Sequence, residues 1–174
     1  LYGFLRLLLP AGAETTYRVF GSALLALARD TSLRDRITAD RSLVALLIEE
    51  TLRWETSVTM VSRRAMVDTE VGGVAVAAGC PVTVFNGAAN RDPARWDDAD
   101  RFDIDREPVG HLAFGTGPHQ CLGMHLARVE LEVGLAAVLD RLPDLHLDPD
   151  EDPPVIAGYA FRGPATLPVV FTPS

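Results

Sequence analysis

Cys121 is the residue of this chain whose type and position point most clearly to chemistry. It lies within a glycine-rich stretch at 114–123, FGTGPHQCLG, just before a strong apolar helical pattern. The N-terminus of a helix favours negative charge, and it therefore favours a thiolate over a thiol. The backbone N–H groups of Leu122 and Gly123 would be free to point at the sulfur. This position predicts a cysteine that acts as a thiolate ligand.

The residues around this cysteine suggest that its partner is flat and bulky. Gly115, Gly117 and Gly123 let the backbone approach such a group closely, because they have no side chain. Phe114 can shield one side of the sulfur, and His119 can reach a carboxylate at the rim. The alternative is a buried structural cysteine that follows a glycine loop, and the motifs below weigh against it.

The stretch at 114–123 resembles the haem-ligand loop of the cytochrome P450 family, whose pattern is F-x-x-G-x-x-x-C-x-G. Four fixed residues at this spacing arise by chance in a chain of this length on the order of one time in a thousand. The resemblance implies that Cys121 is the iron ligand of haem b. It also implies that Phe114, His119 and Gly123 contribute to binding the cofactor.

Residues 11–16, AGAETT, resemble the oxygen-activation motif of the same family. The resemblance implies that Glu14 and Thr15 form an acid–alcohol pair beside the haem. A hydroxyl can hold a water molecule in line, and a nearby carboxylate can relay protons. Considered alone, the segment is better explained as an ordinary helix surface.

Glu50 and Arg53 form an E-x-x-R motif, which also occurs in the family. Residues three positions apart share one face of a helix, so the two side chains can pair. The resemblance implies that Arg101 is their partner and that the three residues together lock a long loop onto the core. The alternative is a solvated ion pair.

Arg63 stands near the end of an expected strand. Aligned on the Gly72-Gly73 pair that follows, it falls at the family position that binds a haem propionate. A guanidinium suits a carboxylate because it is planar, always charged and bidentate. The alternative is a surface arginine. The chain departs from the family at 54–57, WETS, where a proline is usual, and this segment leads into a strand expected to face the substrate.

The elements that must position these residues are mainly helices, and the resemblance implies the C-terminal half of the P450 fold, mainly α with small β-sheets. Apolar periodicity predicts helices over 1–29, 33–39 and 43–54, although the first could instead begin at Pro10. Strands are expected at 58–63, 69–76, 81–84 and 165–171, with turns at Gly72-Gly73 and at 78–79, and a long loop is expected at 90–110. A helix follows Cys121, and we expect one apolar face formed by Leu122, Leu126, Val129, Val133, Ala136 and Ala137.

Composition excludes several classes of protein. The net charge of −8 argues against nucleic-acid binding and against a polybasic membrane anchor. The most apolar stretch, residues 1–10, is interrupted by Arg6 and is shorter than the roughly 20 residues needed to span a bilayer. Two cysteines are too few for a secreted disulfide scaffold, although a single disulfide stays possible.

Several other polar residues suggest no separate site. Cys80 is expected to be structural. The histidines His111, His125 and His146 are expected to be hydrogen-bonded or at the surface. The dense acidic run Asp97, Asp98 and Asp100 is expected to form loop salt bridges with Arg95 and Arg101 rather than a metal site.

The resemblance covers nearly the whole chain and implies a soluble, cytoplasmic monooxygenase of the bacterial type, with residues 1–174 as its C-terminal half and the N-terminal half absent. Such an enzyme takes electrons from a ferredoxin or flavodoxin-type partner and inserts one atom of dioxygen into an apolar small molecule. Residues 58–61 and 159–161 would line the substrate pocket. Two alternatives are an inactive remnant or non-catalytic haem-binding module, and a peroxide-driven peroxygenase, whose relatives typically replace the acid–alcohol pair. We expect the half-chain to expose an apolar surface that favours dimerisation or aggregation.

Overall fold

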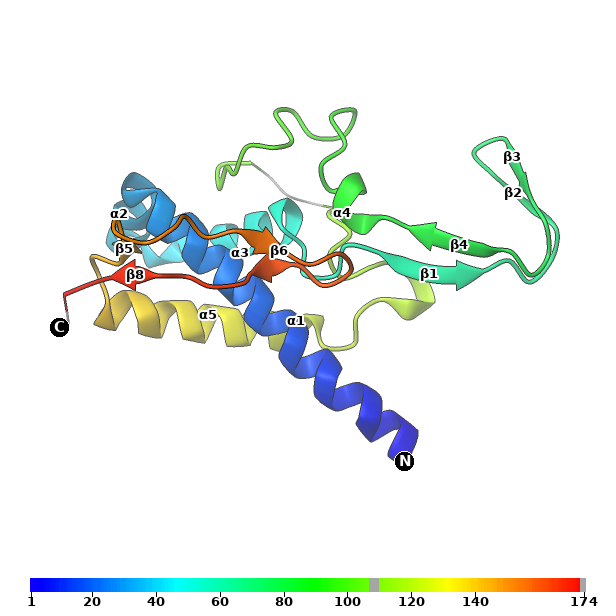
Figure 1. Cartoon of the computed structure of the whole chain (residues 1–174), viewed down its shortest axis with the longest axis horizontal. Coiled ribbons are helices and arrows are strands. Elements are labelled where there is room, and N and C mark those ends of the chain that lie inside the picture. Colours follow the sequence, from blue (N-terminus) through cyan, green and yellow to red (C-terminus); the bar gives the residue numbers. More distant parts are fainter. Residues whose placement is uncertain (107–109, 173–174) are drawn as a thin grey trace.

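A helical layer dominates the computed structural model, which describes residues 1–106 and 110–172 (Figure 1). Two long helices, α1 and α5, cross beside α3, and the strands form small two-stranded pairs. The predicted class, mainly α with small sheets, is confirmed. The helices are α1 (Tyr2–Arg29), α2 (Thr31–Ala39), η1 (Arg41–Leu43), α3 (Val44–Trp54), α4 (Asn86–Ala89), η2 (Gly117–His119) and α5 (Met124–Arg141).

The strands pair antiparallel. They are β1 (Val61–Arg64) with β4 (Pro81–Val84), β2 (Thr69–Val71) with β3 (Val74–Val76), β5 (His146–Leu147) with β8 (Val169–Val170), and β6 (Ile156–Ala157) with β7 (Gly163–Pro164). The turn expected at Gly72-Gly73 is confirmed, because the chain reverses there between β2 and β3 within the expected strand region 69–76. Both glycines have positive φ, of 59° and 82°, a conformation typical of tight hairpin turns.

Helix α1 runs without interruption through Pro10, so the alternative start at that proline was wrong. Its first half is exposed and extends beyond the other elements (Figure 1). In the turn after the proline, the Thr15 hydroxyl donates to the carbonyl of Ala11 at 3.0 Å. The Thr16 hydroxyl donates to the carbonyl of Gly12 at 3.2 Å. These bonds use up carbonyl acceptors within the helix itself.

The core lies where α1, α3 and α5 meet. It contains Val19, Ala23, Leu27, Ile37, Val44, Leu47, Ile48, Leu52, Ile104, Leu131, Leu135 and Leu139. Contact between α1 and α5 is close at Gly134, where an added Cβ would come within 2.7 Å of the Phe20 ring. The missing side chain therefore allows this crossing.

The apolar face expected for the helix after Cys121 is not the buried one. Leu126, Val129 and Val133 are exposed, Val133 by 64%, whereas Leu131 and Leu135 are buried in the core. Apolar residues surround α5 on more than one side. Periodicity along the helix therefore could not decide which side packs against α1 and α3, and the prediction of this face was wrong.

None of the helices in the described part of the chain combines the length and apolar character needed to cross a bilayer. Cys80 and Cys121 are both free and exposed, so the single disulfide left open by the cysteine count does not form.

Candidate functional site

A cavity of about 550 Å³ lies between the middle of α1, strand β1, the loop at 112–123 and the start of α5. Six residues predicted for the site line it: Thr15, Arg63, Phe114, His119, Cys121 and Gly123. Much of the remaining wall is apolar, including Val58, Val61 and Leu126. Folding therefore brings together residues separated by more than half of the chain. Of the expected substrate contacts, those at 58 and 61 line this cavity, whereas Tyr159 lines a separate cleft beside Trp54.

Local backbone geometry sets the position of the cysteine. Gly115 and Gly117 have φ of 65° and 72°, a region that favours glycine. The Cys121 N–H donates to the carbonyl of Phe114 at 2.9 Å. Within the described residues, the N–H groups of Leu122 and Gly123 have no acceptor. They are thus available to stabilise a thiolate.

The cavity suits a large, flat and mostly apolar group. A Cβ added at Gly12 or at Gly123 would meet nothing within 4 Å, so the space beside both backbones is open. Arg63 and His119 are exposed side chains on its wall, where they can reach anionic substituents. These features fit a haem, with its apolar ring and two carboxylates.

The acid and the alcohol of the AGAETT segment lie apart. Thr15 lines the cavity, but Glu14 is not among the lining residues. The Glu14 Oε1 atom instead accepts from Arg18 Nη2 at 3.0 Å, one turn further along α1. This pair forms because i,i+4 neighbours on a helix face can pair directly. The structure therefore brings only the Thr15 hydroxyl of the predicted pair to the cavity.

Glu50 and Arg53 are fully buried, so the alternative of a solvated pair was wrong. Arg53 Nε and Nη2 donate to the two oxygens of Glu50 at 2.7 and 2.8 Å. Arg53 Nη1 also donates to the carbonyls of Asn90 and Ala99 at 2.9 and 2.8 Å. The Asp103 N–H donates to Glu50 Oε1 at 2.8 Å. The pair thereby fastens the loop after α4 onto α3.

The predicted role of the Arg101 side chain was wrong. This side chain is 66% exposed and lies 3.8 Å from Asp103. Arg101 contributes only its carbonyl, which accepts from Arg53 Nη2 at 3.0 Å. The second guanidinium near Glu50, besides that of Arg53, belongs instead to Arg106, whose Nε lies 3.6 Å from Oε1. The loop turns between the two arginines, and nothing in their sequence spacing indicates which one turns inward.

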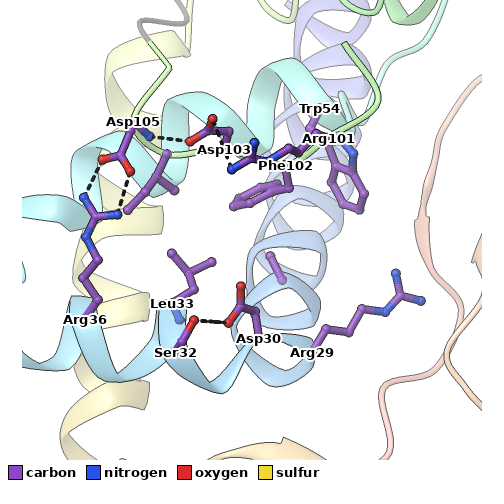
Figure 2. A pocket seen from close by; sticks show the side chains of 12 residues that line it. Arg29, Asp30, Ser32, Leu33, Arg36, Trp54, Arg101, Phe102, Asp103 and Asp105 are labelled. Atoms are coloured by element: carbon purple, nitrogen blue, oxygen red, sulfur yellow. Dashed lines mark hydrogen bonds and ion pairs between the residues drawn. The ribbon is translucent and has the colours of Figure 1, made fainter. Parts of the chain in front are cut away.

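Figure 2 shows how the same loop lies against α1 and α2, around a cleft of about 270 Å³. Arg36 forms a bidentate ion pair with Asp105. The Phe102 ring packs edge-on against Trp54, with centroids 5.4 Å apart. The acidic and basic groups that face this cleft are largely paired with one another. We therefore assign it a structural role.

The acidic run in the loop, Asp97, Asp98 and Asp100, lies against arginine side chains. Among the residues that the structure describes, no group of three potential ligands is assembled. Asp100 pairs with Arg91 at 3.2 Å rather than with the expected Arg95 or Arg101. The carbonyls of Asp97 and Asp98 accept from Arg106. Of the three acids, Asp100 therefore forms an ion pair, with Arg91, whereas Asp97 and Asp98 take part through their backbone carbonyls. Residues 107–109 of the predicted loop lie outside the described part.

One charged cluster was missed by the sequence reasoning. Glu49, next to the E-x-x-R glutamate, accepts from Arg128 Nε and Nη2 at 2.6 and 2.9 Å. His111 Nε2 lies 3.1 Å from Glu49 Oε2. His111 is thus hydrogen-bonded, as expected, and so is His146, whose Nδ1 lies 2.8 Å from the Asp144 carbonyl. The only signal in the sequence was that Glu49 is adjacent to Glu50 of the E-x-x-R motif. This position does not identify Arg128 and His111 as the partners of Glu49.

The Glu49 carboxyl should make part of the free energy of unfolding depend on pH. Partial burial raises its pKa, but the hydrogen bonds from Arg128 and His111 outweigh burial and lower the pKa to about 2. A depressed folded-state pKa stabilises the chain above the unfolded-state value of 4.5, and this contribution disappears as the pH falls towards 2. In urea unfolding at several pH values, the stability advantage over Glu49→Gln should therefore shrink between pH 4.5 and 2. A difference that does not change over this range would contradict the assignment.

Comparisons with known proteins show which family the chain belongs to. The family model described as Cytochrome P450 matches residues 5–160. The mycinamicin IV hydroxylase/epoxidase of Micromonospora griseorubida is 42% identical over 94% of this chain and 42% of that protein. The steroid C26-monooxygenase of Mycolicibacterium smegmatis is 40% identical over 97% of this chain and 42% of that protein. The solved structure of CYP108D1 from Novosphingobium aromaticivorans is 40% identical with a TM-score of 0.92, over 99% of this chain and 41% of that chain.

The chain belongs to the cytochrome P450 family, a class of monooxygenases. Its fold is a partial P450 fold, and it spans 42% of the length of each of the two curated relatives.

Proposed function

We propose that this chain is the haem-binding, C-terminal part of a P450 monooxygenase, with haem b in the 550 Å³ cavity and Cys121 as its iron ligand. The observation that carries the proposal is the convergence of Thr15, Arg63, His119 and Cys121 on one largely apolar cavity. The family membership supports the same cofactor.

Each residue of this chain has a role in the proposed site. Cys121 would bind iron as a thiolate, and the free N–H groups of Leu122 and Gly123 would moderate its charge. Arg63 and His119 would bind the carboxylates of the cofactor. When bound, haem supplies the redox-active iron for inserting oxygen into a C–H bond, and thiolate ligation favours this chemistry.

The hydroxyl of Thr15 would hold a water molecule on the α1 side of the cavity. Its proton is already donated to the Ala11 carbonyl, so its oxygen is left as an acceptor for that water. Glu14 would join a proton relay only after leaving Arg18, its ion-pair partner.

The substrate and the electron donor follow from the family and from the cavity wall. Val58 and Val61 favour an apolar organic molecule. A ferredoxin or flavodoxin-type protein would deliver electrons. The relatives described above come from bacteria, which supports a bacterial, cytoplasmic enzyme.

A second candidate is a remnant or haem-binding module without catalysis. One observation favours it for the 174-residue chain by itself: the exposed apolar faces of α1 and α5. We infer that the remaining part of the P450 fold covers these faces in an active enzyme, since large exposed apolar patches mark interaction surfaces. Alone, the chain should self-associate through them.

The deciding experiment is the carbon monoxide difference spectrum of the reduced, haem-reconstituted chain. A strongly red-shifted Soret band would support thiolate ligation by Cys121 and a chain that folds well enough to hold haem. A band typical of histidine or thiol ligation, or no uptake of haem, would refute haem–thiolate binding by this chain and favour the remnant.

Replacing Thr15 with alanine separates a monooxygenase from a peroxygenase. In a protein that carries the complete P450 fold around this site, Thr15→Ala should lower the product formed per electron consumed, because the acceptor for the ordered water is lost. Electron consumption and product are measured together, with Thr31→Ala, at an exposed threonine of α2 that does not line the cavity, as the control. Unchanged peroxide-driven turnover in Thr15→Ala, with no electron-driven activity in either protein, would instead support a peroxygenase.

A further inference from the structure

The Glu49 carboxylate binds both sides of the cysteine loop from one point on α3. Arg128, which binds it through two nitrogens, lies on α5 after the loop. His111, which binds the same carboxylate, lies just before the loop. None of these three residues lines the cavity. The cluster therefore connects the entry and the exit of the loop without touching what the cavity holds.

The histidine of the cluster has a defined tautomer. Its Nδ1 atom accepts a hydrogen bond from the Ala113 N–H at 3.2 Å. The proton of the neutral ring must then be on Nε2, which donates it to Glu49. Through these two bonds, His111 fixes the backbone immediately before Phe114.

The arginine of the cluster fixes the ring of the next residue in the loop. The Arg128 guanidinium carbon lies 4.7 Å from the centre of the Phe114 ring, a cation–π geometry. The carbonyl of Phe114 accepts the N–H of Cys121 at 2.9 Å. A continuous set of contacts thus runs from Glu49 through Arg128 and Phe114 to the backbone of the cysteine.

We propose that Glu49, His111 and Arg128 form a positioning cluster that holds the backbone of Cys121 against the start of α5. Its importance for an iron ligand rests on the proposed function, but its effect on the loop does not. Charge-assisted, bidentate bonds are the strong ones in proteins, and these are half-buried. Glu49 and Glu50 are adjacent, so α3 holds the cysteine loop with one acid and the loop after α4 with the other.

The test measures amide hydrogen exchange of the 174-residue chain in peptides that cover 111–123. In Glu49→Gln and Arg128→Lys, exchange at Cys121 should be roughly tenfold faster, the factor for losing one charge-assisted hydrogen bond. Exchange in the β1–β4 pair should not change. Glu132→Gln, a substitution at an exposed acid on α5, is the matched control and should behave as wild type.

Thiol labelling gives a second readout. The rate at which Cys121 reacts with a disulfide reagent should change in both variants, whereas Cys80, an exposed free cysteine on the hairpin, should react at its wild-type rate. The effects of the two substitutions should not add, because both break one cluster. Unchanged exchange and labelling at Cys121 would overturn the proposal, and so would unfolding of the whole chain in every variant, including the conservative Glu49→Asp.

These outcomes are independent of haem. If the chain takes up no haem but the loop loosens in the variants, the proposed function fails and the positioning cluster stands. If the red-shifted band appears and the loop is unaffected by the substitutions, the proposed function stands and the positioning cluster fails.

Discussion

Replacing Cys121 with serine is expected to abolish the strongly red-shifted Soret band of the reduced, carbon monoxide-treated and haem-loaded chain. A serine hydroxyl at the same place is not ionised at neutral pH, so it cannot supply a thiolate to iron. Leu122 and Gly123 would keep their free N–H groups, but these groups would face a neutral oxygen. The measurement is the difference spectrum at matched haem content.

Cys80 offers a matched control for this experiment. It is also free and exposed, but it lies immediately before β4 and does not line the 550 Å³ cavity. Cys80→Ser should therefore retain the band. If Cys80→Ser lost it and Cys121→Ser kept it, the assignment of the iron ligand would have to move to the hairpin.

Replacing Arg53 with alanine should cost about 3–5 kcal/mol of unfolding free energy, the usual effect of removing one partner of a buried ion pair. Arg53 is fully buried, and its loss would leave the Glu50 carboxylate with a weaker set of donors. It would also leave the carbonyls of Asn90 and Ala99 without their guanidinium donor. Since domains are stable by only about 5–15 kcal/mol, much of the chain should unfold under mild conditions.

Urea unfolding followed by circular dichroism checks this value. Arg41→Ala is the control, because Arg41 forms an exposed ion pair with Asp140 at 3.0 Å. Such surface pairs contribute about 0–1 kcal/mol. An Arg53→Ala variant as stable as Arg41→Ala would show that the buried pair does not hold the loop. Arg53→Lys should fall between them, because lysine keeps the charge but cannot form the fork of hydrogen bonds.

The two adjacent acids of α3 each hold one of the irregular loops in place. Through Glu50 and Arg53, the helix holds the loop that follows α4. Through Glu49, it holds the loop that carries Cys121. Both loops have turn hydrogen bonds of their own, and the bonds to α3 fasten them to the helical core. A single short helix therefore organises the irregular half of the structure.

Sequence alone determined the features that depend on local order. The positive-φ glycines, the free N–H groups after Cys121 and the i,i+3 pairing of Glu50 with Arg53 all follow from residues close along the chain. The continuous helix over 2–29 follows from its apolar spacing. The motif spacing also led to the correct family, and six of the predicted site residues line one cavity.

Only the tertiary structure decided the features that depend on distant partners. Whether Arg101 or Arg106 approaches Glu50 is set by the path of a loop with no repeating pattern. Which side of α5 is buried is set by the crossing with α1, because apolar residues occur on several sides of the helix. Glu49 pairs with His111 and Arg128 for the same reason. A charge takes the partner that the packed backbone brings within reach, and sequence spacing does not encode that distance.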